Sequence, residues 1–347
     1  MDSPVSTRMR KVTMTDVARM AGCSQATVSF VLNNVPDIKI SADTKNKVLK
    51  AARVLKYGVT SLNARSGLNA AHSIGFIVDQ LATSPESVNA IEGARQASWQ
   101  DSTVILTAQT MGVAAMEEAV VKTMLHAGVS GLVYMSIFTR QVILPRALLL
   151  LPIPVVLLNC YTDAGEFPAI VPDEVEGGKR ATQALLKRGR TRIATITGEP
   201  FMEASQQRLQ GYRVALQTAG YRVDGDIIVE GNWSPTSGYD ATKKLLAMRH
   251  PPDGIFCQND KMASGCFEAM REAGLSIGAD MSVIGYDDDE LCRHLRPQLS
   301  TIVLPHREMG SWAIHMLNSE AGKFPTSMHR AHNCEKAECT LIMRNSI

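Results

Sequence analysis

The sequence has no apolar run that approaches the roughly 20 residues needed to cross a bilayer as a helix. Its first residues include Asp2, Pro4 and several basic side chains, and they lack the apolar block of a signal peptide. Its seven cysteines are odd in number and include no C-x-x-C pair, which is typical of reduced thiols rather than of a disulfide framework. These absences predict a cytoplasmic protein with no membrane partner.

The signatures of common catalytic sites are also missing. No H-E-x-x-H, P-loop or G-x-S-x-G motif occurs, so we expect no enzyme, no catalytic residue and no cofactor. One cluster could offer zinc two imidazoles and two thiolates, a set that suits tetrahedral coordination. It consists of His329, His332, Cys334 and Cys339, all within eleven positions. Its spacing fits no common zinc finger, and we therefore expect no metal site.

The charge that the sequence does contain is distributed unevenly. Residues 1–65 hold eleven Lys and Arg against four Asp and Glu, a net charge of +7. The remaining 282 residues carry 25 basic and 30 acidic side chains, a net charge of −5. A basic segment on an acidic body indicates contact with a polyanion, although a solvated basic surface would give the same count. With 347 residues and 45% hydrophobic content, the chain is long enough for two or three domains.

The basic segment begins with the pattern of a short amphipathic helix. Val17, Met20 and Ala21 recur at positions i, i+3 and i+4. We expect Thr15 to cap this helix and Gly22 to end it.

A second helix follows the glycine directly. Ser24 can cap it, and the run Asn33-Asn34-Val35-Pro36 stops it. Residues 44–57 form a third apolar-periodic segment that would complete a three-helix core. We expect inward side chains at Ala26, Val28 and Val31 or Leu32, and outward ones at Gln25, Thr27, Ser29, Phe30 and Asn33. Such outward groups can read base edges in the major groove, although a small helical bundle without a nucleic-acid role would share the pattern.

From residue 73 onward, strand-like and helix-like segments alternate. The apolar runs "IGFIV", "VILT", "GLVYM" and "PVVLLN" form one series, and "RIATIT", "DIIVEG", "GIFCQ" and "SVIGY" form another. This alternation predicts an α/β fold with two lobes, each built on a doubly wound parallel sheet.

Ligands of such sheets bind at the carboxyl ends of the strands, so the polar residues after each run are informative. These are Asp79, Asn159, Asn259-Asp260 and Tyr286-Asp287, a set of donors and acceptors with an aromatic that suits a polyhydroxylated ligand. Two other interpretations stay open: Asp260 could simply cap the helix that follows it, and Asp288 and Asp289 could form a solvated loop.

The segments "VTMTDVARMAGCSQATVSFVLNN" and "ISADTKNKVLKAARVLKY" closely resemble the DNA-binding headpiece of the LacI/GalR family of bacterial transcriptional repressors. Downstream, "EVEGGKRATQALLKRGRTRIATITG", "RLQGYRVALQTAG", "GIFCQNDKMASG" and "DMSVIGYDD" resemble the effector domain of that family. The resemblance implies a helix-turn-helix headpiece over residues 1–57, a hinge over 58–72 and a two-lobed, periplasmic-binding-protein-like domain for effector binding and dimerisation over 73–347. We expect the first lobe to comprise about 73–170 and 302–328, and the second about 171–301 with the C-terminal strands.

The resemblance also implies which headpiece residues meet DNA. Ser24 matches the cap of the recognition helix, and Gln25 and Ala26 match its two main base-reading positions. Ser29 and Phe30 match a further pair, where many family members have an arginine at the second position. The positions that usually meet phosphates are Thr13, Thr27, Asn33, Ser41, Thr44 and Tyr57.

The segment "GVTSLNARSGLNAAHS" resembles the family's hinge, which folds on operator DNA and inserts a leucine into the minor groove. The expected leucine falls on Ser66 or Gly67, and Leu68 is the nearest candidate. Val59 replaces the usual proline, so hinge folding is weaker or its register is shifted.

In the effector domain, Arg208 and Trp233 align with family positions that hydrogen-bond sugar hydroxyls and cover an apolar sugar face. The complete set of expected effector residues is Asp79, Asn159, Arg208, Trp233, Asn259 and Asp287. The segments "NCYTDAGEFPAIVPDE" and "IVLPH" resemble the branch of the family that responds to sucrose or other glucosides.

The implied function is a repressor that binds a near-palindromic operator as a homodimer and releases it when a sugar binds. The C-terminal "TLIMRNSI" lacks the leucine heptads of a tetramerising helix. Two alternatives stay open. The chain could be a two-lobed sugar-binding transport or chemosensory protein, or a regulator that uses a non-sugar corepressor.

The aromatic at position 30 generates a testable prediction. Phenylalanine cannot donate a bidentate bond to guanine but can lie against a thymine methyl, so we expect no required guanine at its position in the half-site. Operator selection from a random duplex pool, with the wild type and Phe30→Arg, measures this. We expect the variant to acquire a guanine preference. An identical base preference at every position would instead indicate that Phe30 only packs against the headpiece core.

Overall fold

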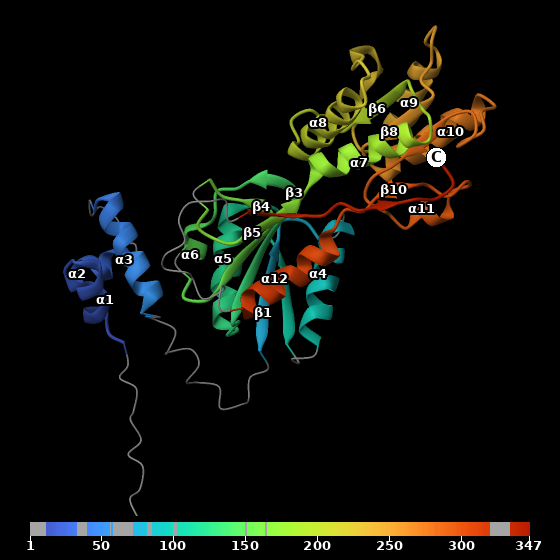
Figure 1. Cartoon of the computed structure of the whole chain (residues 1–347). Helices are drawn as coiled ribbons and strands as arrows, with labels where there is room; N and C mark the ends of the chain where they lie inside the picture. The colour runs from blue at the N-terminus through green and yellow to red at the C-terminus, as the bar shows by residue number, and fades with distance from the viewer. Residues whose placement is uncertain are drawn as a thin grey trace, which may run out of the picture.

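The computed structural model describes residues 12–32, 40–55, 57, 72–81, 85–99, 103–149, 151–163, 165–319 and 334–347 (Figure 1). Several predicted positions lie outside these ranges, namely Asn33, Ser66, Gly67, Leu68, His329 and His332. The predictions about the hinge therefore remain predictions.

The first headpiece helix, α1 (Met14–Ala21), is capped two residues earlier than predicted. The hydroxyl of Thr13 accepts a bond from the backbone N–H of Asp16, and the Asp16 carboxylate accepts one from the backbone N–H of Thr13 at 2.9 Å. This reciprocal capping box is unavailable to Thr15, so the prediction of Thr15 as the cap is wrong. Gly22, at φ 65°, ends the helix as predicted.

The helices α2 (Gln25–Leu32) and α3 (Ala42–Val54) are also capped by a serine hydroxyl. Ser24 accepts from the backbone N–H of Thr27 at 3.1 Å, and Ser41 accepts from that of Thr44 at 3.2 Å. Ala26 is exposed, contrary to the predicted inward orientation. The buried core of the three helices consists of Val17, Ala18, Ala21, Val28, Val31, Val48, Ala51 and Ala52. The predicted helix-turn-helix with a third closing helix is confirmed.

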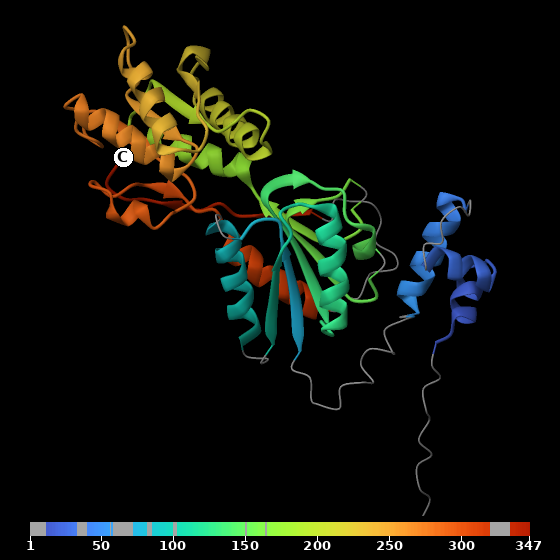
Figure 2. The ribbon, with the colours of Figure 1, turned by 180° about the vertical axis from the view of Figure 1, so that it is seen from behind.

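The first lobe is built on a six-stranded parallel sheet of order β11-β5-β4-β3-β1-β2. Its strands are β1 (Ser73–Val78), β2 (Val104–Gln109), β3 (Gly131–Gln141), β4 (Val155–Tyr161), β5 (Ala169–Pro172) and β11 (Cys334–Ala337). The helices α4 (Pro85–Ser98) and α12 (His306–Asn318) pack on one face, and α5 (Ala114–His126) and α6 (Arg146–Leu149) pack on the other. Figures 1 and 2 show these two layers from opposite sides.

The second lobe repeats this plan on a four-stranded parallel sheet of order β7-β6-β8-β9. Its strands are β6 (Ile193–Thr197), β7 (Ile228–Glu230), β8 (Gly254–Cys257) and β9 (Ser282–Ile284). The helices α7 (Glu174–Lys187) and α8 (Glu203–Thr218) cover one face, and α9 (Pro235–Leu246) and α10 (Asp260–Glu272) cover the other. Three short elements complete the lobe: η3 (Gly225–Ile227), α11 (Leu291–His294) and the antiparallel pair of β10 (Thr301–Ile302) with β12 (Leu341–Ile342).

Within the described residues, the chain passes between the lobes after β5, after β10 and after β11. The strand β11 pairs with β5 in the first sheet, although the sequence placed the C-terminal strands in the second lobe. Only β12 lies in the second lobe, where it pairs with β10. The short run Cys334–Ala337 carries no signal that distinguishes the edge of one sheet from that of the other.

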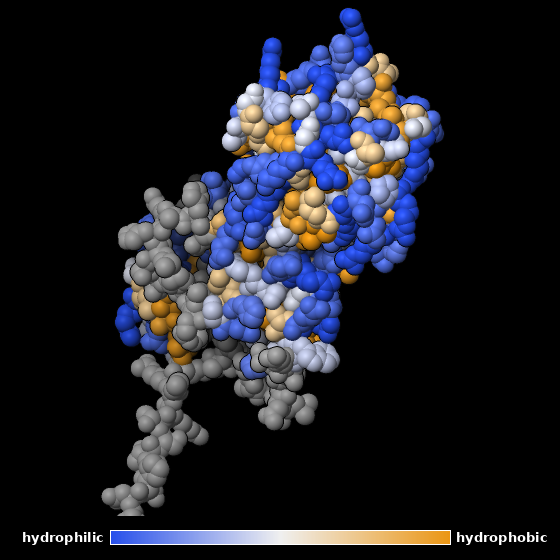
Figure 3. Space-filling model, turned by 45° about the vertical axis from the view of Figure 1, so that its right-hand side comes forward, coloured by the Kyte–Doolittle hydropathy of each residue, from blue (hydrophilic) through white to orange (hydrophobic). Residues whose placement is uncertain are grey.

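All seven cysteines are among the described residues, and all are free thiols. Cys334 lies in the first lobe, whereas Cys339 lies in the core of the second. In the part of the chain that the structure describes, no group of three or more His, Cys, Asp or Glu residues could hold a metal ion. No helix among those residues is long and apolar enough to cross a membrane. The face in Figure 3 is mostly hydrophilic, with smaller apolar patches between the charged side chains.

Two glycines allow α9 and α10 to pack in close contact. A Cβ atom at Gly238 would overlap the carbonyl oxygen of Met262, and one at Gly265 would overlap that of Pro235. Backbone atoms cannot yield as the end of a flexible side chain can, so both positions require glycine.

We therefore expect Gly265→Ala to lower the free energy of unfolding of the second lobe by about 1–3 kcal/mol, the usual cost of overpacking a core. Thermal unfolding followed by circular dichroism measures the change. Gly225→Ala is the matched control, because a Cβ atom at Gly225 meets no atom within 4 Å. Equal melting temperatures for the two variants would contradict the assignment of close helix packing to Gly265.

Candidate functional site

The helix α2 presents its predicted base-reading residues to solvent. Gln25 and Ala26 are exposed, and Phe30 is 36% exposed and lies outside the headpiece core. Ser29 is half-buried. This orientation agrees with the predicted outward face of the helix.

The residues predicted to meet phosphates lie at helix starts and at the end of the headpiece. The hydroxyls of Ser24 and Thr27 lie 2.9 Å apart, and those of Ser41 and Thr44 lie 2.8 Å apart. Thr13 donates its hydroxyl to Asp16 at 2.7 Å, and Tyr57 packs partly buried against the core. The start of a helix carries unpaired backbone N–H groups and the positive end of the helix dipole, which favours phosphate.

The six predicted effector residues gather where the two sheets end. Five of them follow strands or lie at strand ends, and Arg208 reaches the site from α8; the five are Asp79 (β1), Asn159 (β4), Trp233 (β7), Asn259 (β8) and Asp287 (β9). Asn159, Trp233 and Asp287 have positive φ values of 58°, 66° and 115°. Such backbone conformations cost energy in residues other than glycine, and they concentrate at functional sites.

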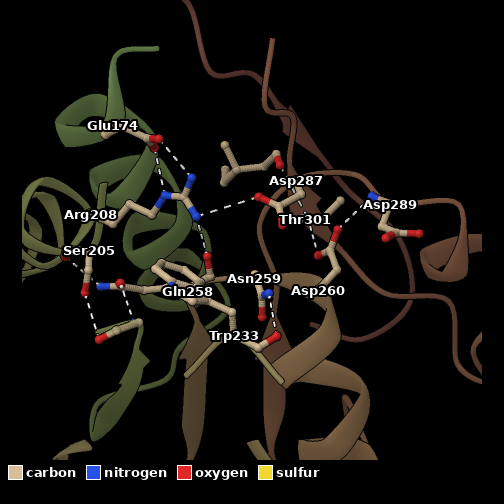
Figure 4. Close-up of polar contacts among 12 residues, drawn as sticks. Glu174, Ser205, Arg208, Trp233, Gln258, Asn259, Asp260, Asp287, Asp289 and Thr301 are labelled. Carbon is tan, nitrogen blue, oxygen red and sulfur yellow. Dashed lines mark hydrogen bonds and ion pairs between the residues drawn. The ribbon is translucent and has the colours of Figure 1, made fainter. Parts of the chain in front are cut away.

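Arg208 is the centre of the arrangement in the second lobe (Figure 4). Its Nε and Nη2 atoms donate to the two carboxylate oxygens of Glu174 at 2.8 and 2.9 Å. Its Nη1 atom donates to the carbonyl oxygen of Gln258 at 2.5 Å and lies 3.7 Å from Oδ1 of Asp287. Both Arg208 and Glu174 are almost completely buried, with 4% and 1% of their side chains exposed. A bidentate pair of this kind has fixed geometry.

The surroundings of Arg208 and Asp287 raise the pKa values of both groups. Burial alone would lower the pKa of Arg208, but the adjacent Glu174 carboxylate outweighs burial and raises it. Burial raises the pKa of Asp287 despite the opposing effect of Arg208, and the nearby carboxylate of Asp260 adds to the rise. Arg208 therefore stays charged.

Trp233 packs beside the arginine. Its ring centroid lies 5.7 Å from Cζ of Arg208, and its ring occupies the space that a side chain at Gly198 would need. Tyr286 lies against the guanidinium as well, with its ring centroid at 3.7 Å. The guanidinium is thus held by aromatic rings and hydrogen bonds together.

The amide of Asn259 is used within the protein. Its Oδ1 atom accepts the backbone N–H of Met262 at 2.8 Å and so caps α10, while its Nδ2 atom donates to the carbonyl oxygen of Trp233 at 3.0 Å. The expectation that Asp260 caps this helix is wrong, because Asn259 does so. Asn259 instead fixes the strained backbone of Trp233.

Asp260 links three parts of the second lobe. It accepts the hydroxyl of Thr301 at 2.6 Å and the backbone N–H of Asp289 at 2.9 Å. Its side chain is fully buried, and burial raises its pKa to about 7. Asp288 accepts from Arg344 at 2.6 Å. The alternative of a solvated loop at Asp288 and Asp289 is therefore wrong, since both residues take part in this network.

In the first lobe, the side chains of Asp79 and Asn159 form hydrogen bonds with the irregular end of β3. Asp79 accepts from the backbone N–H of Ile137 at 2.9 Å and from Arg140 at 3.2 Å. Asn159 donates to the carbonyl oxygens of Ser136 and Ile137 and accepts from Thr139 at 2.6 Å. Both residues thus position residues 136–140, where the register of β3 against β4 shifts.

This extension of β3 reaches the second lobe. Both carboxylate oxygens of Glu203, the first residue of α8, lie 3.1 Å from the hydroxyl of Tyr161. One of them also accepts the backbone N–H of Gln141 at 3.3 Å. Glu203 therefore bridges the ends of β3 and β4 to the second lobe.

Four residues of this region were not predicted from the sequence: Glu174, Gln258, Glu203 and His306. Gln258 directly follows β8 and Glu174 lies two residues after β5, so the strand-end rule could have identified them. His306 begins α12 after a lobe crossing, and its buried Nε2 atom has no hydrogen-bond partner among the described residues. Burial lowers its pKa to about 4, against the influence of Glu86 and Glu174, so it is uncharged at neutral pH.

Comparison with known proteins gives consistent results for both parts of the chain. Residues 13–58 match the model of bacterial regulatory proteins of the lacI family, and residues 182–347 match a periplasmic binding protein-like domain. The chain is 33% identical to the ribose operon repressor of Escherichia coli K12 over 305 residues, which cover 88% of this chain and 92% of that protein. It is 31% identical to the HTH-type transcriptional repressor PurR of Vibrio cholerae, with coverage of 88% and 90%. The solved complex of the transcriptional regulator CelR with cellobiose aligns with a TM-score of 0.63 and 25% identity, and the alignment covers 97% of this chain and 100% of that one.

The raised pKa of Asp260 generates a prediction for stability. The unfolded chain releases this proton near its ordinary pKa of 3.8, whereas the folded protein keeps it up to about pH 7. The contribution to stability is therefore complete below about pH 4 and is lost as the pH rises through 7. Asp260→Asn cannot titrate, so its melting temperature relative to the wild type should rise between pH 5 and 8. Each unit of pKa corresponds to about 1.4 kcal/mol, so the effect amounts to a few kcal/mol at most.

Differential scanning fluorimetry across this pH range measures the difference. Asp240→Asn, on the exposed face of α9, is the control and should follow the wild type at every pH. A constant offset between Asp260→Asn and the wild type would show that the buried carboxyl does not titrate in this range.

Proposed function

Because the chain belongs to the lacI family of bacterial regulatory proteins, we propose that it represses carbohydrate-utilisation genes and leaves its operator when a small sugar binds between its lobes. The relatives that it matches are transcriptional repressors. We place the protein in the cytoplasm, where its operator is.

One observation carries the proposal for the effector: a charged donor, a carboxyl acceptor and an indole ring lie together at the strand ends of the second lobe. Arg208 and Asp287 are 3.7 Å apart, and the ring of Trp233 lies beside them. Adjacent donors and acceptors suit the hydroxyls of a sugar, and an aromatic ring suits its apolar face. The CelR relative was solved with cellobiose, a disaccharide.

We propose that the protein acts as a homodimer. The first lobe exposes large apolar side chains on α4, β2 and the start of α5, a surface that a second copy would cover; they are Val88, Trp99, Val104, Met111, Val113 and Met116. A dimer places two α2 helices in successive major grooves, so the operator is near-palindromic. The predicted reading residues are Gln25, Ala26, Ser29 and Phe30, and phosphates are met by the helix-start hydroxyls and by basic side chains of the headpiece.

The lobes transmit binding to the headpieces. If the lobe arrangement that the sugar favours spaces the two headpieces incorrectly, operator affinity falls by the coupling free energy. Such couplings typically amount to about 1–3 kcal/mol, which is a factor of about 5 to 150 in affinity.

A second candidate effector is a purine that acts as corepressor. The identity to PurR repressors favours it, and the face of Trp233 could stack on a base. The two candidates change operator affinity in opposite directions, because a corepressor tightens operator binding whereas an inducing sugar weakens it.

The proposal predicts a ligand-dependent change in operator affinity. An operator is first selected from random duplexes, and fluorescence anisotropy then measures its affinity with ribose, sucrose, cellobiose or hypoxanthine. We expect one of the sugars to weaken binding by about 5- to 150-fold. Trp233→Ala should abolish this response and keep operator binding, whereas Tyr221→Ala, beyond the far end of α8, should preserve both.

Tighter binding with hypoxanthine would support the purine corepressor instead. A protein with no preference for any duplex over random competitor at moderate salt would contradict the proposed repressor function altogether.

A further inference from the structure

The charge of Arg208 is already balanced inside the protein. Glu174 takes two of its N–H groups in a bidentate pair, and the carbonyl oxygen of Gln258 takes a third. A guanidinium has five N–H groups, so two remain for other partners. One of these is on Nη1, the atom that lies 3.7 Å from Asp287. The arginine therefore offers a ligand hydrogen bonds but little net positive charge.

A competing anion would need a large free energy to separate Arg208 from Glu174. Glu174 and Arg208 have only 1% and 4% of their side chains exposed. A ligand phosphate that took Arg208 away from Glu174 would leave a buried carboxylate without a partner, which is strongly unfavourable. A negatively charged ligand therefore has to bind beside the pair and not in place of Glu174.

The neighbouring charges also oppose an anion. Asp287 is 25% exposed and adds an acid on the far side of Arg208. Of the other basic side chains near these strand ends, Arg140 pairs with Asp79 at 3.2 Å and Arg344 pairs with Asp288 at 2.6 Å. His306 is buried and uncharged at neutral pH. Arg140, Arg208 and Arg344 are thus each paired with an acid, and Asp287 adds a further one.

The gap between Arg208 and Asp287 fits a hydroxyl. A distance of 3.7 Å is too long for a direct hydrogen bond, but one oxygen atom can lie within bonding distance of both groups. A hydroxyl there accepts from Arg208 and donates to Asp287. A phosphate or carboxylate oxygen has no hydrogen to donate and would meet the carboxylate of Asp287 directly.

We infer that the effector is an uncharged polyhydroxylated molecule, and that the Glu174–Arg208 pair makes the site reject its phosphorylated and carboxylated analogues. This inference rests on the proposed function, in which a sugar binds at these residues. It goes further by specifying the charge of the ligand and by assigning the selection to Glu174.

The test compares sugars that differ only in charge. Isothermal titration calorimetry on the full-length protein measures the binding of ribose against ribose 5-phosphate, glucose against glucose 6-phosphate, and cellobiose against cellobionate. We expect a neutral member to bind and its anionic partner to bind at least about tenfold more weakly, a difference of about 1.4 kcal/mol. Equal or tighter binding of an anionic member by the wild type would overturn the inference.

Glu174→Gln tests the assigned residue. The substitution keeps the shape of the side chain and removes its charge, so Arg208 regains a net positive charge. We expect the preference for the neutral sugar over its phosphate to shrink by at least about tenfold, equivalent to about 1.4 kcal/mol. If the binding of the neutral sugar and of its phosphate weakens equally, Glu174 has only a structural role and the assignment is overturned. Glu176→Gln, in the same first turn of α7 but half-exposed and paired with Lys179, should leave the preference unchanged.

A second variant keeps the test decisive if Glu174→Gln does not fold. Asp287→Asn removes the excess acid and should also reduce the discrimination against the phosphate, whereas an unchanged ratio would count against the inference. The outcomes separate the two proposals. Binding of anionic sugars overturns only the charge selection, but the absence of binding by any sugar removes the proposed sugar effector and this inference with it.

Discussion

The pairing of Arg208 with Glu174 is the interaction on which the second lobe's site depends. It joins the start of α7 to α8, and through the carbonyl oxygen of Gln258 it joins both helices to the end of β8. A buried ion pair is costly to desolvate, so it gives weak evidence for stability and better evidence for a fixed geometry. Trp233 and Tyr286 lie against the same guanidinium.

The two lobes contribute differently to this region. In the second lobe, Arg208 keeps unused donors and Asp287 is partly exposed. In the first lobe, the polar atoms of Asp79 and Asn159 form hydrogen bonds with residues 136–140 of β3. The first lobe therefore supplies shape through a fixed backbone segment, while the second supplies the side-chain chemistry.

Much of the fold could be predicted from periodicity, because alternating buried strands and amphipathic helices have few ways to pack. The glycine turn at Gly22 and the cap at Ser24 follow from local chemistry alone. The cap at Thr13 was missed because Thr15 is an equally good capping residue, and only the partner Asp16 separates the two. The placement of β11 was missed because it depends on pairing with β5, a contact across more than 150 residues.

The site could be located from sequence, but the roles within it could not. The strand-end rule identified Asp79, Asn159, Asn259 and Asp287, yet three of these four use their polar groups to hold the protein's own backbone. Whether a side chain faces a ligand or a neighbouring loop depends on tertiary contacts that one sequence does not encode visibly. Glu174 shows the same limit, since an acid at a helix start is ordinarily explained by the helix dipole.

Glu203 connects the two lobes through contacts of its own. Because its bonds to Tyr161 and Gln141 join the lobes without involving Arg208 or Trp233, they bias the angle between the lobes independently of what the site selects. A substitution at this bridge would move the concentration at which a gene switch responds and leave its choice of signal molecule intact. Sensitivity and selectivity can thus evolve at separate positions of one chain.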